Sequence, residues 1–133
     1  LDLIRLKGFK PIFTEEQNKI REEILNNYRD YLPVKNDDLA KQLDVKTEEF
    51  DEVFNAMINN QEIIRLSKDI CLSMENYYRA LDILKDYISK NDSITIGEFR
   101  DLINTNRKIA LGLLEYFDQL KVTKREGEKR VLV

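Results

Sequence analysis

The feature of this 133-residue sequence that most constrains its fold is an internal repeat of apolar positions. Residues 38–73 can be written above residues 98–133 so that apolar side chains coincide, although few residues are identical. At an offset of 60 the matched pairs are Leu39 and Phe99, Leu43 and Ile103, Val53 and Leu113, Phe54 and Leu114, and Met57 and Phe117; at an offset of 59 they are Ile63 and Val122, and Leu72 and Val131. The repeat predicts two tandem copies of one fold, at residues 1–73 and 74–133.

Each copy contains the same predicted elements in the same order. A long amphipathic helix comes first: Thr14 and Gln17 form a capping-box pattern at its start in copy one, and residues 73–91 carry the helix in copy two. A short helix follows at residues 37–43 or 96–103, then a helix at 47–59 or 105–120, and finally a two-stranded hairpin. This order is that of a winged helix-turn-helix domain. The predicted fold class is mainly α with small β-hairpins, in two tandem winged helix-turn-helix domains.

The composition argues against catalysis. The chain has no histidine, one cysteine and four glycines, so the usual transition-metal ligands, the usual neutral-pH base and glycine-rich phosphate loops are lacking. We expect neither enzyme activity nor a cofactor or metal in these residues. No apolar tract approaches a membrane span, no leader pattern is present, and Cys71 has no internal disulfide partner. These features predict a cytoplasmic monomer without a membrane partner.

Charge separates the two copies. Residues 1–73 carry 11 basic and 15 acidic side chains, a net charge of −4, whereas residues 105–133 carry 7 and 4, a net charge of +3. The third helix of a helix-turn-helix module presents its first turn to nucleic acid. We expect Thr47 and Thr105 to cap the two third helices, followed by acids in copy one but by Asn106, Arg107 and Lys108 in copy two. Cations at a helix start oppose the helix dipole, which suggests an outside anion.

The hairpins differ in the same direction. The first, "IIRLSKDICLS", is mostly apolar and predicts a surface that packs, whereas "VTKREGEKRVLV" turns at Gly127. Basic side chains around that turn are expected to be exposed, at Lys124, Arg125, Lys129 and Arg130. Because the basic helix start and the basic hairpin belong to one copy, they predict a nucleic-acid contact there, and they do not distinguish DNA from RNA.

Residues 94–132, "ITIGEFRDLINTNRKIALGLLEYFDQLKVTKREGEKRVL", resemble the last winged-helix domain of the bacterial selenocysteine-specific elongation factor family, SelB. "GFKPIFTEEQ", residues 8–17, is similar to the junction before the penultimate domain. The resemblance implies the RNA-binding end of a translation factor, whose last domain grips the selenocysteine insertion hairpin of a messenger RNA and directs selenocysteine to a recoded UGA codon. It further implies a ribosome partner, and GTP, magnesium and selenocysteinyl-tRNA held by amino-terminal domains that these residues lack.

Carried over by position, the resemblance implies RNA contacts from Thr105, Asn106, Arg107 and Lys108, from Lys124, Arg125, Lys129 and Arg130, and more weakly from Arg100. Copy one would then be a spacer or a ribosome-facing domain. Two other functions remain open from the sequence. The acidic first copy and negative net charge are also compatible with a winged-helix protein-interaction module, and the fold with a DNA-binding regulator, although no long dimerisation helix is evident.

Overall fold

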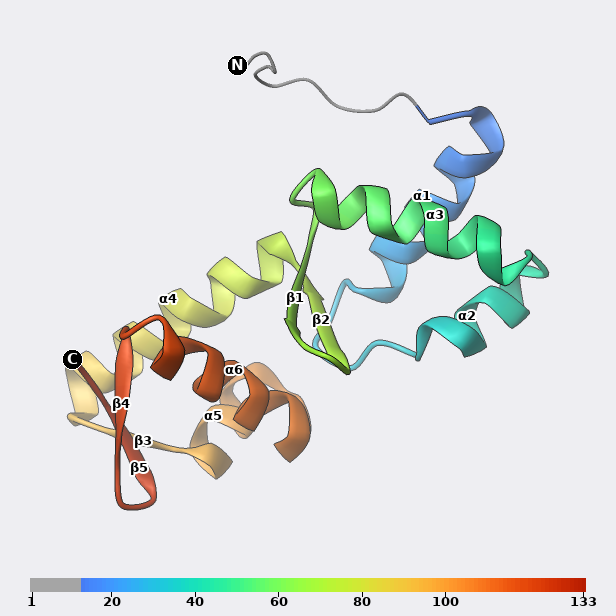
Figure 1. Ribbon diagram of the computed structural model, residues 1–133. Helices are drawn as coiled ribbons and strands as arrows, with labels where there is room; N and C mark the ends of the chain where they lie inside the picture. Colours follow the sequence, from blue (N-terminus) through green and yellow to red (C-terminus); the bar gives the residue numbers. More distant parts are fainter. Residues whose placement is uncertain (1–12) are drawn as a thin grey trace, which may run out of the picture.

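A computed structural model describes residues 13–133 of the chain (Figure 1). The elements of the first copy are α1 (Glu15–Asn27), α2 (Asn36–Leu43), α3 (Thr47–Asn59), β1 (Ile63–Ser67) and β2 (Ile70–Ser73). Those of the second copy are α4 (Met74–Asn91), β3 (Ile94–Thr95), α5 (Ile96–Ile103), α6 (Arg107–Gln119), β4 (Thr123–Glu126) and β5 (Lys129–Leu132). The two copies have the predicted winged-helix order. The first half of the domain-junction motif at residues 8–17 lies outside the described residues.

In the first copy, three helices surround an apolar core. The predicted capping box at the start of α1 is confirmed: the Thr14 hydroxyl accepts from the Gln17 amide at 3.1 Å, and the Thr14 amide donates to the Gln17 side chain at 3.0 Å. Pro33 separates α1 from α2, as expected from its inability to continue a helix. The core side chains come from α1, α2, α3 and the first wing: Ile20, Ile24, Tyr28, Leu39, Ala40, Phe50, Val53, Phe54, Met57, Ile63 and Cys71.

The second copy adds a strand that the sequence reading missed. β3 pairs antiparallel with β5, which also pairs with β4, so the sheet order is β3-β5-β4. A two-residue strand is too short to show an alternating pattern, and it runs directly into α5. Its Ile94 is fully buried beside Phe99, Leu113, Leu114 and Phe117 in the second core. β3 thereby fixes the base of the second wing against the start of α5.

The helix starts correct two predicted caps. The N-cap of α3 is Lys46, not Thr47, and that of α6 is Asn106, not Thr105. The Asn106 side chain accepts a hydrogen bond from the Ile109 amide at 2.9 Å, as a good N-cap residue does. With Lys46 matched to Asn106, the offset of 60 continues through the turn, so Thr47 corresponds to Arg107 and Glu48 to Lys108.

The register of the wings corrects one predicted match. β1 begins at Ile63 and β4 at Thr123, so the offset is still 60 there, and Thr123 rather than Val122 occupies the place of Ile63. β1 contains an irregularity between Arg65 and Ser67 that β4 lacks. One extra residue in β1 reduces the offset to 59 in the second strand, where the predicted match of Leu72 with Val131 is confirmed.

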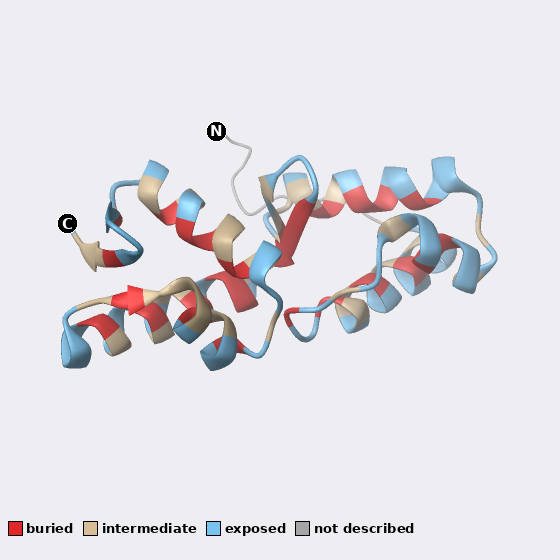
Figure 2. Cartoon of the chain, turned by 90° about the horizontal axis from the view of Figure 1, so that it is seen from below, coloured by how far each residue is buried: buried red, intermediate tan, exposed pale blue. Residues whose placement is uncertain are grey.

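The first wing packs against the second copy, as its apolar sequence predicts. Leu72 is part of the second core, and Ile64 and Leu66 lie against it. Figure 2 shows buried residues continuing from this wing into the helices of both copies. A Cβ added at Gly112 of α6 would lie 2.5 Å from the Ile70 side chain, so a glycine lets the wing approach the helix closely.

A polar network also joins the copies. The buried Asn76 amide of α4 donates to the carbonyls of Tyr28 and Arg29 at 2.9 and 3.0 Å, and the Tyr31 hydroxyl donates to the Asn76 carbonyl at 2.8 Å. The carbonyls left open at the end of α1 thus receive donors from the second copy. The predicted boundary between residues 73 and 74 falls where β2 passes directly into α4.

Candidate nucleic-acid interface

A basic hollow lies between the start of α6 and the second wing. Its volume is about 370 Å³, and it is lined by Thr95, Ile96, Gly97, Arg107, Arg125, Glu128, Lys129 and Arg130. The helix-start cation Arg107 and the wing cations Arg125 and Lys129 therefore face one concave surface, although Arg107 lies 18 or more residues before the other two in sequence. The fold thus brings the first turn of α6 together with the second wing at these three residues.

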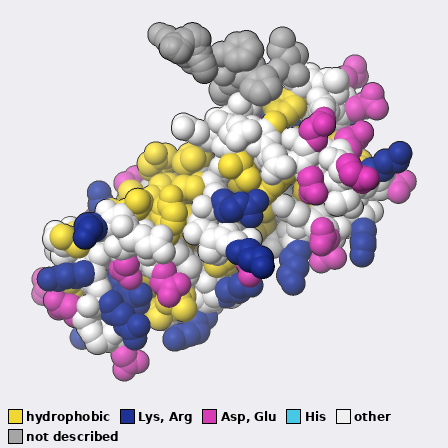
Figure 3. All heavy atoms as spheres, viewed as in Figure 1, with side chains coloured by type: hydrophobic (Ala, Val, Ile, Leu, Met, Phe, Trp, Pro, Cys, Tyr) yellow, Lys and Arg dark blue, Asp and Glu magenta, His cyan; other side chains and the backbone are white. Residues whose placement is uncertain are grey.

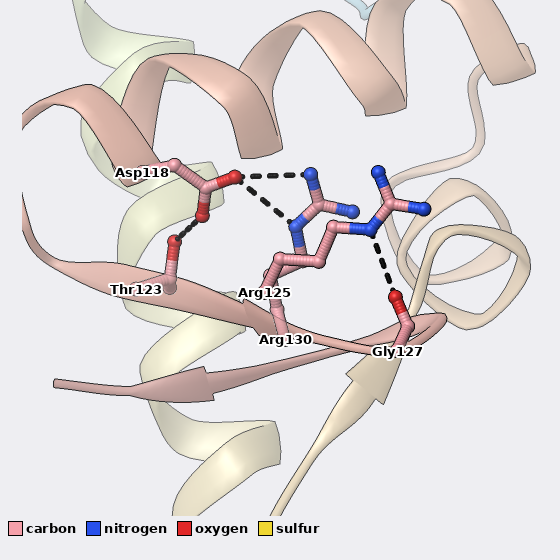
Figure 4. Close-up of polar contacts among 5 residues, drawn as sticks. All are labelled: Asp118, Thr123, Arg125, Gly127 and Arg130. Carbon is pink, nitrogen blue, oxygen red and sulfur yellow. Dashed lines mark hydrogen bonds and ion pairs between the residues drawn. The ribbon is translucent and has the colours of Figure 1, made fainter.

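The exposed cations of this hollow are available to an anion. Arg107, Arg125 and Lys129 are exposed, and none of them forms an ion pair within residues 13–133. The Arg125 Nε donates to the Gly127 carbonyl at 2.8 Å, and its terminal nitrogens have no partner among the described residues (Figure 4). Gly127 has φ 65°, the left-handed conformation that a tight wing turn requires and that glycine adopts without strain.

Arg130 differs from the other wing cations, and its expected exposure is wrong. Its side chain is only 4% exposed, and its Nε and Nη2 lie 3.2 and 2.9 Å from Asp118 Oδ2. The Thr123 hydroxyl donates to the other oxygen of the same carboxylate at 2.6 Å (Figure 4). Like charges opposite one another in a sheet repel, and Arg130 lies opposite Arg125. Asp118 neutralises Arg130 and so reduces its repulsion of Arg125, which lies at the surface.

The remaining predicted residues lie at the edges of the hollow or outside it. Lys124 is exposed and lies 3.7 Å from Glu126, an exposed pair that contributes little stability. Arg100 is paired with the adjacent Asp101 at 2.9 Å. It does not line the hollow, although its guanidinium lies beside Gly97, which does. The Thr105 hydroxyl donates to the Tyr31 carbonyl of the first copy at 2.7 Å. Thr105 therefore joins the two copies.

Asn106 and Lys108 face a second concave surface, which we call the inter-copy groove. Its volume is about 590 Å³, and its cationic lining residues are Lys35, Arg65, Lys68 and Lys108. The sequence analysis did not identify the first three. In the first wing, Asp69 offsets the charge of the adjacent Lys68, and Lys35 lies outside both the helix start and the wing. The signal that could have identified Arg65 is the internal repeat, since Arg65 of the first wing matches Arg125 of the second.

The Glu98 carboxylate at the start of α5 lies near the Lys129 cation of the basic hollow, and its pKa reflects this. A backbone hydrogen bond from Thr95 is the main cause that lowers the pKa of the Glu98 carboxyl, and the Lys129 charge lowers it further. Glu98 completes a capping box with Thr95, with hydrogen bonds of 2.9 and 3.1 Å. The carboxylate is thus committed to the helix start, where it lies near Lys129 without forming an ion pair with it.

The first copy presents the opposite charge at its helix starts. Glu15 and Glu16 lie in the first turn of α1, and Glu48 and Glu49 in the first turn of α3, where acids are favoured by the helix dipole. Figure 3 shows acidic side chains gathered over the end of the molecule formed by α1 and α3, and basic ones over the middle and the second copy. Within residues 13–133 no group of three or more potential metal ligands is found, and no helix is long and apolar enough to cross a membrane.

Comparison with known proteins identifies related sequences and folds. The family described as "Elongation factor SelB, winged helix" matches residues 86–132. The selenocysteine-specific elongation factor of Desulfomicrobium baculatum is 22% identical over 131 residues, covering 97% of this chain and 21% of the relative. That of Escherichia coli (strain K12) is 26% identical over 129 residues, with the same two coverages. The chain thus spans about a fifth of the length of these relatives.

A solved structure of similar fold has an RNA ligand. The mRNA-binding domain of elongation factor SelB from E. coli, in complex with SECIS RNA, has a TM-score of 0.72 and 25% identity to this chain. The match covers 90% of this chain and 98% of that one. A bacterial selenocysteine-specific elongation factor has a TM-score of 0.64 at 18% identity, covering 98% of this chain and 22% of that structure.

Proposed function

We propose that this chain belongs to the C-terminal winged-helix domains of the SelB elongation factors and binds a selenocysteine insertion hairpin in messenger RNA. Through that hairpin it would direct selenocysteine incorporation at a UGA codon. The observation that carries the proposal is the convergence of Arg107, Arg125 and Lys129 on one hollow without ion-pair partners among residues 13–133. The resemblance of 90% of this chain to an mRNA-binding domain solved in complex with SECIS RNA supports it.

The shape of this surface suits an RNA hairpin. The major groove of A-form RNA is too deep and narrow for side chains, so specificity comes from unpaired loop bases and from shape. The wing and the first turn of α6 form two walls of a hollow, and a hairpin tip can be held between them while phosphates contact the three cations. In this proposal Asn106 supplies polar contacts at the ridge beside the hollow, whereas Arg130 and Thr105 hold the surface in place.

The finer assignments rest on the family. We infer that the full-length protein carries a GTPase with its magnesium ion and a selenocysteinyl-tRNA site in domains outside this chain, and that it acts on the ribosome in the cytoplasm. The chain itself would supply RNA recognition as a monomer and no catalysis.

A pair of double variants tests the proposed surface. Arg107→Ala with Lys108→Ala should abolish tight binding of the hairpin in a gel-shift titration, whereas Glu48→Ala with Glu49→Ala should not weaken it. Lys19→Ala with Lys41→Ala is a matched control, because it removes the same charge from exposed positions of the first copy. Equal loss of affinity in the Arg107/Lys108 variant and the matched control would contradict the assignment of this site.

A second experiment separates recognition from attraction to phosphate. We expect specificity for an unpaired loop base, so a hairpin with that base deleted should bind more weakly at the same salt concentration. Equal affinity for the intact and deleted hairpins would reduce the proposed function to non-specific electrostatics.

A further inference from the structure

The first copy has an apolar socket that lies between the first turns of α1, the end of α2 and the start of α3, and its volume is about 260 Å³. In Figure 1 these helices form the end of the molecule away from the second wing. The floor of the socket is the buried Ile20 with the half-buried Leu43 and Val45. The rim carries four exposed charged side chains, which are Glu16, Lys19, Glu23 and Glu49.

The internal repeat identifies the corresponding surface of the second copy. The offset of 60 extends to the first helices, because the buried Ile20 and Ile24 of α1 then match the buried Ala80 and Leu84 of α4. Each residue that lines the socket therefore has a counterpart in the second copy. Besides Ala80, these counterparts are Asn76, Arg79, Ile83, Ile103, Thr105 and Ile109.

In the second copy this surface holds Tyr31, which follows α1 of the first copy. The Tyr31 hydroxyl donates to the Asn76 carbonyl at 2.8 Å, and the Tyr31 carbonyl accepts from the Thr105 hydroxyl at 2.7 Å. Tyr31 also belongs to the same core cluster as Ala80 and Ile103. The second copy thus receives one aromatic side chain from its neighbour, and the socket is the equivalent position of the first copy.

The socket differs from its filled counterpart in its hydrogen-bonding groups. The Asn76 side-chain amide donates to the Tyr28 carbonyl at 2.9 Å. Glu16 takes the place of Asn76 in the socket, and an ionised carboxylate only accepts hydrogen bonds. The hydroxyl donor Thr105 is replaced by Val45, whose side chain has no donor. Because the socket lacks both donors, it suits an occupant that brings donors of its own.

Two further replacements make the rim of the socket acidic. Glu23 and Glu49 stand where the second copy has Ile83 and Ile109, which pack against its core. The rim has three carboxylates and one ammonium group, a net charge of −2, and none of them forms an ion pair within residues 13–133. A helix dipole favours acids in the first turn of a helix, but Glu23 lies beyond the first turn of α1.

We propose that the socket docks a protein segment in which one aromatic side chain is flanked by lysine or arginine residues. The ring occupies the apolar floor, as Tyr31 does in the second copy, and the flanking cations donate charge-assisted hydrogen bonds to the rim carboxylates. The rim repels the phosphates of a nucleic acid. A second copy of this chain cannot supply Tyr31 as the anchor, because that side chain is only 7% exposed. This interaction is additional to hairpin binding and does not depend on it.

The test is an NMR titration of the isotopically labelled full chain with a short synthetic peptide that has a central phenylalanine between two pairs of lysines. A second peptide has serine in place of the phenylalanine. The socket variant is Glu16→Gln, Glu23→Gln and Glu49→Gln. The matched control is Glu22→Gln, Asp38→Asn and Asp51→Asn, which removes three exposed acids of α1, α2 and α3 that do not line the socket. Circular dichroism verifies that both variants fold.

The phenylalanine peptide should change the amide chemical shifts of the native chain at residues 16–23 and 43–49. The socket variant should bind this peptide about tenfold more weakly than the native chain, from the loss of three exposed charge pairs. The matched control should lose less affinity, because it reduces only the long-range attraction. The serine peptide should bind the native chain more weakly than the phenylalanine peptide does, since it buries no apolar ring. The socket variant should bind the hairpin no more weakly than the native chain.

Three results would overturn the proposal: equal losses of affinity in the socket variant and the matched control, equal binding of the two peptides, or no binding of the phenylalanine peptide at millimolar concentration. Sedimentation provides a further check. A concentration-dependent dimer that the socket variant abolishes would assign the socket to a second copy of this chain and would also overturn the proposal. Each of these results leaves the proposed function intact, because hairpin binding is measured separately.

Discussion

The internal repeat gives a specific prediction for the contribution of the Asp118–Thr123–Arg130 cluster to the free energy of unfolding. At the corresponding positions the first copy has apolar residues: Ile58 for Asp118, Ile63 for Thr123 and Cys71 for Arg130. The second copy therefore joins its third helix to its wing with an ion pair, whereas the first copy joins them by apolar packing. Replacing the ion pair by the apolar residues of the first copy tests how much the ion pair contributes to the free energy of unfolding.

The perturbation is Asp118→Ile, alone and together with Thr123→Ile and Arg130→Cys. The single change leaves the Arg130 guanidinium buried without its carboxylate and removes three hydrogen bonds, two from Arg130 at 2.9 and 3.2 Å and one from the Thr123 hydroxyl at 2.6 Å. Removing one partner of a fully buried pair costs about 3 to 5 kcal/mol, and because Asp118 is 26% exposed we expect the low end, about 3 kcal/mol. The triple variant should be close to the native chain in stability, because well-packed apolar residues often replace a buried ion pair without loss.

The assay is equilibrium unfolding in urea, from which the free energy of unfolding is extrapolated. The same triple variant, which lacks Arg130, should retain hairpin affinity if that residue has only a structural role. A single variant as stable as the native chain, or a triple variant no more stable than the single one, would refute the reasoning. Lost hairpin binding by a well-folded triple variant would restore Arg130 as an RNA contact.

Three further predictions concern the frame around the site. Thr105→Val should lower the free energy of unfolding in urea by about 1 kcal/mol through loss of the hydrogen bond to Tyr31; an unchanged value would show that this bond does not hold the copies together. Phe117→Ala should cost about 3 to 5 kcal/mol as a folding defect, since the ring is fully buried; native stability would contradict the assigned core. Because the folded-state pKa of Glu98 is lowered, its contribution is present above its ordinary pKa and lost as pH falls through the folded value. Glu98→Gln should therefore reduce the loss of stability between neutral and acidic pH in thermal unfolding, and an identical pH profile would show that the Glu98 charge does not contribute to this loss.

Amphipathic periodicity was enough to predict most of the fold. The apolar repeat identified Phe54 and Leu114, and their neighbours one turn away, as core positions, and both lie in hydrophobic cores. The capping box at Thr14 was readable because its residue types occur at a fixed local spacing. The apolar first wing predicted packing, although the surface that covers it belongs to the second copy and could not be named.

The errors occurred where one residue type has several uses. Threonine is a good N-cap, so Thr105 was assigned to that role, but its hydroxyl instead donates to Tyr31, 74 residues away. Arg130 lies in a basic segment, and only the three-dimensional position of Asp118 shows that it is buried and neutralised. Long-range partners of this kind leave no pattern in a single sequence. The clustering of Arg107 with the second wing was predictable, because the order of elements in a winged helix determines it.

The most direct test of the central claim is an NMR titration of the isotopically labelled chain with the selenocysteine insertion hairpin. On addition of the hairpin, the largest amide chemical-shift changes should occur at residues 106–108 and 124–129, with little change at residues 47–52 at the start of α3. The largest shifts at the start of α3, or none at the start of α6 and the second wing under saturating hairpin, would contradict it.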